Sequence, residues 1–207
     1  MTMADLERYS ECWRAALSRA VRARDLLQWE RVEQRPRVVT YQSEEADLTA
    51  VKLVMQTHLH PEQVLGYLYS DWLQANDRLQ PDIVESHQVL EEYADRQRLW
   101  IQRLKSPFWT VSARELLLFD SYLPSVHMSV SVTSGEYAES EDYLRAELLY
   151  GAHFVEETRS GTRLTAVALG DPKGWIPAFL VRWKITERGV FYEALLKDME
   201  EKCYMHE

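Results

Sequence analysis

The chain has 207 residues, of which 46% are apolar and 28% are charged, and its net charge is −9. This composition is ordinary for a globular protein with a substantial core, and nothing marks a domain boundary, so we expect one domain over residues 1–207. The acidic balance argues against binding to nucleic acid, because neutralising phosphates needs a basic face.

Cysteine usage and the N-terminal residues bear on the compartment. Cys12 and Cys203 are too few for a disulfide framework, which favours a reducing compartment. Residues 1–27 mix acidic and basic side chains and lack a long apolar run, so we interpret them neither as a signal peptide nor as a membrane span. The sequence therefore predicts a cytoplasmic protein.

The predicted elements begin with a helix over Leu6 to Leu27, where Tyr9, Trp13 and Leu17 recur at helical spacing. Alternating and β-branched residues then predict strands, interrupted by two short helices. The expected strands are Trp29–Gln34, Arg37–Ser43, Leu48–His58, Ile83–Tyr93, Arg98–Lys105, Arg114–Tyr122, Val126–Thr133, Tyr143–Glu156 and Arg163–Leu169, and the expected short helices are Pro61–Tyr69 and Trp72–Leu79.

A long amphipathic segment runs from Ile176 to the C-terminus, after a turn rich in Pro and Gly at Asp171–Pro177. Its apolar residues lie three and four apart and begin with Ile176, Phe179, Leu180 and Trp183. Consecutive strands with short turns predict an antiparallel sheet, and helices segregated to its ends give an α+β fold. A helix of about thirty residues, rising roughly 1.5 Å per residue, can span such a sheet either as ordinary core or as a lid over a cavity.

Three segments together resemble the START (steroidogenic acute regulatory protein-related lipid transfer) family. They are Ser70-Asp71-Trp72, then Lys105-Ser106-Pro107-Phe108 leading to Ser112-Ala113-Arg114-Glu115, and finally Leu144-Arg145-Ala146-Glu147 followed by Asp171-Pro172-Lys173-Gly174-Trp175-Ile176-Pro177. The last stretch is the most specific, and the resemblance covers nearly the whole chain.

The resemblance implies a helix-grip fold, in which a curved antiparallel sheet of about nine strands wraps around the C-terminal helix and encloses a tunnel for one lipid. It also implies a protein without catalytic activity or cofactor, which binds or transfers lipid and meets membranes transiently as a monomer. The implied gate consists of the C-terminal helix, with Ile176, Phe179, Leu180 and Trp183, and the loop Ser106–Val111.

Two positions depart from known branches of the family. Phosphatidylcholine carriers have an Arg directly after the Ser-Asp-aromatic segment, where this chain has Leu73, and the sterol branch has an Arg six residues beyond the signature Arg, where this chain has Asp120. Neither selectivity pattern transfers to this chain.

Alternation along Arg114 to Tyr122 places Leu116, Leu118 and Asp120 on one strand face, which the resemblance turns toward the tunnel. A buried carboxylate must be paired, hydrogen-bonded or protonated. We expect Asp120 to contact a ligand hydroxyl or amine, or to pair with an interior Arg such as Arg145; the alternative is an exposed Asp at a strand end.

Four aromatic residues have two interpretations each. Tyr67 and Trp72 either line the tunnel near a lipid headgroup or belong to the core of the short helices. Phe108 and Trp109, next to Lys105, either insert at a membrane interface or pack inward within their loop.

Other chemistry has weaker support. His58 and His60 share a strand face, but no cysteine or carboxylate cluster completes a metal site near them. A cavity enzyme of the cyclase or aromatase type would need an acid-base pair, for which Asp120 with His127 or His153 is the candidate, although nothing in the sequence brings them together. A lipid sensor that binds a protein partner is the third possibility.

Overall fold

The helices and strands of the computed structural model agree closely with the expected elements. It describes residues 3–93, 96–106, 108, 110–174, 176 and 178–204, except for the side chains of residues 178–184 and 204. The elements are α1 (Met3–Leu26), β1 (Glu30–Gln34), β2 (Val38–Glu45), β3 (Leu48–Thr57), α2 (Pro61–Ser70), α3 (Trp72–Leu79), β4 (Val84–Tyr93), β5 (Gln97–Leu104), β6 (Arg114–Leu123), β7 (Val126–Ser131), β8 (Leu144–Arg145), β9 (Glu147–Thr158), β10 (Gly161–Asp171) and α4 (Ala178–Tyr204).

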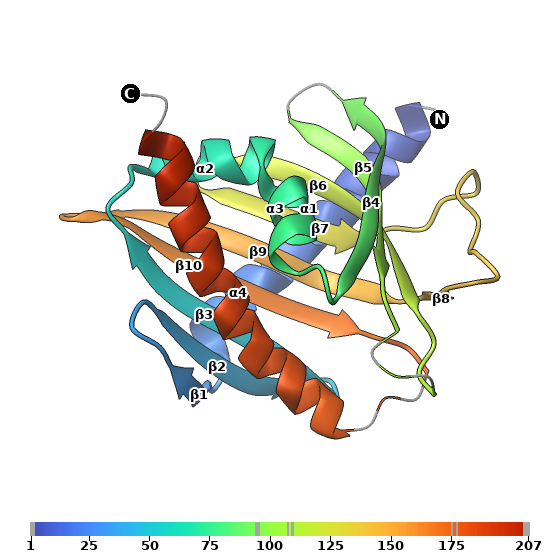
Figure 1. The fold of residues 1–207 in the computed structure, drawn as a ribbon. Coiled ribbons are helices and arrows are strands. Elements are labelled where there is room, and N and C mark those ends of the chain that lie inside the picture. Colours follow the sequence, from blue (N-terminus) through green and yellow to red (C-terminus); the bar gives the residue numbers. More distant parts are fainter. Residues whose placement is uncertain are drawn as a thin grey trace.

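The strands form one curved sheet in the order β1-β2-β3-β10-β9-β7-β6-β5-β4. Neighbouring strands on this path are antiparallel, as the short turns between consecutive strands predict. The sheet bends around α4, which crosses its concave side (Figure 1). The predicted α+β helix-grip architecture is therefore confirmed.

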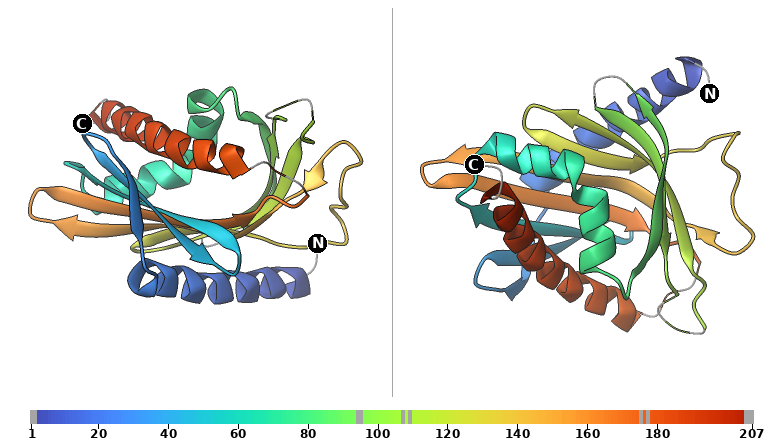
Figure 2. Two further views of the ribbon diagram at one scale, coloured as in Figure 1. Left: turned by 90° about the horizontal axis from the view of Figure 1, so that it is seen from below. Right: turned by 45° about the horizontal axis from the view of Figure 1, so that its top comes forward.

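Helices cover both faces of the sheet. Figure 2 shows α1 along the outer face and α4 on the opposite, concave side, with the sheet between them. Strand alternation divides β6 between two cores: Leu117 and Phe119 pack on the α1 side, whereas Leu118 packs on the α4 side. The concave side therefore receives every second residue of each strand, among them the ones expected to face the tunnel.

One expected strand is divided in two. We predicted a continuous strand over Tyr143–Glu156, but β8 separates from β9 at Ala146. β7 pairs only with the second half of β6, and β8 lies parallel beside the first half, with Arg145 opposite Glu115. The Ala146 N–H donates to the Glu115 carbonyl at 2.9 Å, so the chain satisfies this edge of β6 before it joins β9.

Candidate functional site

A cavity of about 400 Å³ lies between the concave face of the sheet, α3 and α4. This volume falls within the range of about 300–1,000 Å³ that is typical of small-molecule sites. The aliphatic part of the wall comes from β3, β6, β9 and β10 and includes Leu53, Leu116, Leu118, Leu148, Ala166 and Ala168. Aliphatic side chains accept a hydrocarbon ligand without leaving polar groups unsatisfied.

Three of the six residues predicted to line the tunnel do line this cavity. They are Trp72, Leu116 and Leu118. The other three, Tyr67, Arg145 and Asp120, are not among the described residues of the cavity wall.

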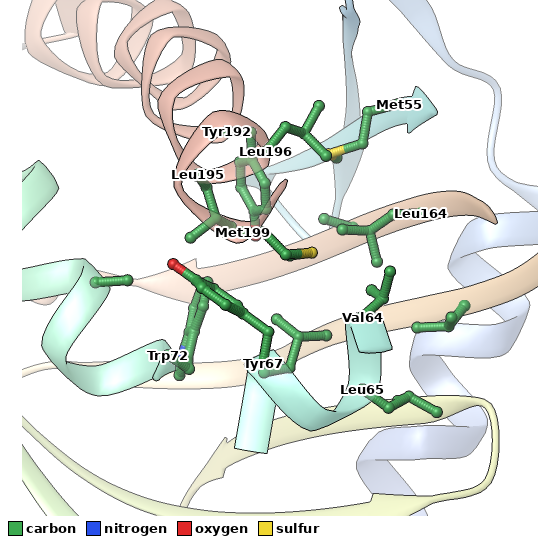
Figure 3. Close-up of a cluster of buried hydrophobic side chains, with 14 of the residues drawn as sticks. Met55, Val64, Leu65, Tyr67, Trp72, Leu164, Tyr192, Leu195, Leu196 and Met199 are labelled. Carbon is green, nitrogen blue, oxygen red and sulfur yellow. The ribbon is translucent and has the colours of Figure 1, made fainter. Parts of the chain in front are cut away.

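Tyr67 and Arg145 are held away from the cavity by polar partners. The Tyr67 hydroxyl donates to Asp198 on α4, which fixes the ring in the core between α2 and α4 (Figure 3). Arg145 donates to Glu115 on β6 at 2.8 Å, alongside Arg103, so its charge is balanced there. Both residues therefore stabilise the fold around the cavity.

Asp120 is completely buried but is paired with Arg98, not Arg145. Its carboxylate accepts from Arg98 Nε at 3.1 Å, from Trp100 Nε1 at 2.8 Å and from His127 Nε2 at 3.3 Å, and it also accepts from Ser129. Burial acts to raise the pKa of Asp120, but the hydrogen bond from His127 and the charge of Arg98 outweigh it and lower the pKa below its usual value. Asp120 is thus ionised and fully occupied by protein donors.

A chain of buried hydrogen bonds connects Asp120 to the cavity wall. His127 Nδ1 lies 3.1 Å from His153 Nδ1, and His153 Nε2 lies 2.6 Å from the Tyr192 hydroxyl. His127 and His153 are directly opposite each other on β7 and β9, with their rings stacked 6° from parallel. His153 and Tyr192 line the cavity, so the acid-base residues considered in the sequence do come together. We call Asp120, His127, His153 and Tyr192 the histidine relay.

Sequence reasoning missed Arg98, Trp100, Ser129 and Tyr192 as neighbours of this site. Their signal lies in strand register: Arg98 is opposite Asp120 across β5 and β6, and Ser129 is opposite Asp120 across β6 and β7. Directly opposite side chains lie on the same face and within contact distance. A sequence-based pairing of the two hairpins would have placed Arg98 and Ser129 beside Asp120.

The two parts of the expected gate meet at Arg114. Its guanidinium donates to the Ser112 carbonyl at the end of the 106–111 loop, and to the Pro172 and Lys173 carbonyls at 3.2 and 3.1 Å before α4. Gly174 follows with φ of +63°, a conformation that favours glycine. A single side chain thus ties both segments together at the cavity wall.

The expected lid residues are only partly described. Ile176 lines the cavity, while the side chains of Phe179, Leu180 and Trp183 lie outside the described residues, although α4 carries their backbone. In the 106–111 loop, Phe108 is 48% exposed, and Trp109 lies outside the described residues.

The C-terminal half of α4 is fastened to the rest of the fold by side chains. Glu200 accepts two hydrogen bonds from Arg37, Asp198 accepts from Arg78 at 2.6 Å, and Lys202 pairs with Asp71. Phe191, Leu195, Leu196 and Met199 are buried in the same half. This half of the helix is therefore an anchor, and the part before Gly189 is the part that covers the cavity.

At Gly189, α4 packs tightly against the β1–β2 hairpin. A Cβ atom built there lies 2.8 Å from Glu33 Oε2 and 3.1 Å from Thr40 Oγ1. We expect Gly189→Val to lower the free energy of unfolding by about 1–3 kcal/mol, because the larger side chain forces the helix away from the hairpin. Urea unfolding measures the change.

The matched control is Gly189→Ala. Its single methyl group requires small shifts of the Glu33 carboxylate and the Thr40 hydroxyl, and alanine favours the helix by about 0.5–1 kcal/mol over glycine, so stability should stay close to that of the native chain. A Gly189→Val variant as stable as Gly189→Ala would show that the helix does not depend on this approach.

The described part of the chain contains neither a metal-binding cluster nor a membrane-spanning helix. No group of three or more His, Cys, Asp or Glu residues there could hold a metal ion. His58 instead lies 3.2 Å from Glu200 through its Nδ1 atom. Within the same residues, no helix is both long enough and apolar enough to cross a membrane.

Comparison with known proteins bears on the family. The START domain model matches residues 108–195, which include the Ser-X-Arg-Glu segment, both histidines of the relay and most of the cavity strands. The resemblance to the START family is confirmed. The START fold extends beyond the matched residues: human StAR-related lipid transfer protein 5 superposes with a TM-score of 0.78 at 14% identity, covering 97% of this chain and 99% of that one.

Two further structures share the START fold. Human STARD10 has a TM-score of 0.69 at 19% identity, over 90% of this chain and 78% of its own. The Zhui aromatase/cyclase from Streptomyces sp. R1128 has a TM-score of 0.50 at 12% identity, over 74% of this chain and 94% of its own. Identities this low establish the fold alone. No curated protein matches the sequence.

Proposed function

We propose that the protein binds one lipid molecule in the 400 Å³ cavity and moves it between membranes without changing it. The aliphatic wall beneath α4 is the observation that supports this most. Each buried CH₂ group contributes about 0.8 kcal/mol, so a chain of about sixteen carbons gains roughly 12 kcal/mol on entering such a cavity. The same energy makes unaided escape of the lipid into water very slow.

The gate in this proposal consists of the part of α4 before Gly189 and the Ser106–Val111 loop, joined through Arg114. Neutral carbonyls are the hydrogen-bond acceptors of the Arg114 guanidinium, and each weakens when the loop or the start of α4 moves. The anchored C-terminal half of α4 lets the first half move without unfolding the core. Opening at this end exposes the cavity beside Ile176.

Membrane contact belongs to the same proposal. Phe108 exposes about half of its surface on the gate loop, three residues after Lys105, and an aromatic beside a cation suits the lipid headgroup region. We propose transient contact of Phe108 and Trp109 with a membrane surface, made by a monomer of one domain that works in the cytoplasm.

A transfer assay tests this function. Donor vesicles carry labelled phospholipid, sterol, fatty acid or fatty alcohol, acceptor vesicles carry none, and the label in the acceptors is measured with and without protein. We expect faster transfer of at least one class, with the lipid recovered chemically unchanged. No acceleration for any class would refute the carrier.

A cavity enzyme of the cyclase or aromatase type is the second candidate, and the histidine relay is the observation that favours it. A relay that ends in a hydroxyl at the cavity wall can accept a proton from a molecule in the cavity. Recovery of a converted lipid in the transfer assay would favour this enzyme over the carrier. A lipid sensor would capture lipid in the same assay without accelerating its transfer.

A further inference from the structure

With Asp120 ionised and both histidines neutral, the histidine relay has one direction. Ionised Asp120 can only accept, so the proton between it and His127 resides on His127 Nε2. In a neutral His127 the Nδ1 atom is then an acceptor, and the proton in the 3.1 Å contact resides on His153 Nδ1. His153 Nε2 accepts in turn, so the Tyr192 hydroxyl donates its only proton to it.

Charge balance keeps this direction. Asp120 supplies the negative charge of this buried group of side chains. Arg98 lies 3.1 Å from its carboxylate and neutralises that charge. The site is closed to solvent, so neutral His127 and His153 leave no unbalanced charge in it beside the Arg98–Asp120 pair. Burial also holds the pKa of His153 well below its usual value.

The charged and titratable groups around the histidine pair are consistent with the same state. Arg98 and Asp120 face it from β5 and β6, Tyr122 stacks on His127, and Tyr192 and Arg188 face it from α4. Arg188 is the positively charged residue that α4 contributes to this group, and it is exposed at the rim of the cavity. A cation on that side opposes protonation of His153.

Ser129 on β7 is a second hydroxyl whose proton is directed toward Asp120. It lines the cavity from β7, and its hydroxyl donates to Asp120. The Tyr192 proton is thus donated toward Asp120 through the two histidines, and the Ser129 proton is donated to Asp120 directly. Both oxygens have only lone pairs left for a molecule in the cavity.

On this geometry, and given the lipid-binding function proposed above, we infer that Tyr192 and Ser129 form an acceptor site for the polar group of the ligand. The group that fits is a hydrogen-bond donor, namely the hydroxyl of a lipid alcohol. A carbonyl of the same size brings lone pairs against lone pairs and leaves the contact unsatisfied. Asp120 determines this selectivity without touching the ligand, because it orients the donors that do.

The test compares octadecan-2-ol with octadecan-2-one, which differ only in the polar group. Each displaces a fluorescent fatty probe from the full chain at pH 7.5. We expect the alcohol to bind roughly tenfold more tightly, as for a lost buried hydrogen bond. In Tyr192→Phe the preference should fall to about twofold or less, because only Ser129 is left to accept.

His153→Leu distinguishes the relay from simple packing. Without His153, the Tyr192 proton is released and can be donated to a carbonyl, so the ketone should gain affinity and approach the alcohol. A merely structural role for His153 would weaken both ligands alike. Equal affinities in the native chain, a preference for the ketone, or an unchanged preference in Tyr192→Phe would overturn the inference while the carrier function stands. Failure of the native chain to bind the probe or either ligand would instead remove the proposed function, and the inference with it.

Discussion

Asp120→Asn is expected to lower the free energy of unfolding by about 3–5 kcal/mol, the typical cost of leaving one member of a buried ion pair without its partner. Arg98 is 8% exposed and donates to Asp120, to the Tyr122 hydroxyl and to the Tyr69 carbonyl, so it cannot turn to water without breaking all of them. The amide side chain keeps the size of the carboxylate and removes its charge. Urea unfolding at neutral pH measures the loss.

Two further variants make this result specific. Asp25→Asn removes a carboxylate from the exposed pair with Arg24, whose members are 48% and 26% exposed, and should cost less than about 1 kcal/mol. Asp120→Leu combined with Arg98→Met removes both buried charges and should recover much of the stability lost in Asp120→Asn. An Asp120→Asn variant within about 1 kcal/mol of the native chain would contradict the role of this pair.

Ala168→Trp is expected to abolish lipid binding, with a loss of affinity of about a hundredfold or more. Ala168 lines the cavity from β10, between Val51 on β3 and Gly151 on β9. An indole there occupies much of the 400 Å³ that a hydrocarbon chain would fill. A hundredfold loss corresponds to about 2.8 kcal/mol, equal to excluding about three or four CH₂ groups. Retention of labelled lipid after gel filtration measures it.

The matched control places the same side chain outside the cavity. Arg163→Trp lies on β10 too, at a position that is exposed and does not line the cavity, and should leave binding within about threefold of the native chain. A thermal unfolding temperature for Ala168→Trp close to the native value establishes that the fold persists. Full binding by a folded Ala168→Trp variant would show that the lipid lies elsewhere.

Most of the fold could be predicted because its elements are long and strongly periodic. The alternation in Arg114–Tyr122 separates Leu118 from Leu117 and Phe119, and the structure places them on opposite faces of β6. β8 could not be predicted in this way. Its two residues carry no period, and their parallel pairing depends on where β7 ends, which only the assembled sheet determines.

The site was harder to predict because it depends on register between strands. Asp120 was expected to contact a ligand hydroxyl or amine, or to pair with an interior Arg such as Arg145, and in the structure it pairs with Arg98. Arg145 lies opposite Glu115, five residues along β6 from Asp120, and so balances that carboxylate. The histidine relay was harder still to predict from the sequence, because it joins β6, β7, β9 and α4 through contacts that no local pattern encodes.

Native mass spectrometry tests the central claim most directly. The purified chain is equilibrated with vesicles that contain phospholipids, sterols, fatty acids and fatty alcohols, separated from them, and weighed intact. The cavity predicts one lipid of unaltered mass on each native chain and none on Ala168→Trp. A native chain recovered without lipid from every mixture, or with as much lipid on folded Ala168→Trp, would contradict a lipid-binding cavity beneath α4.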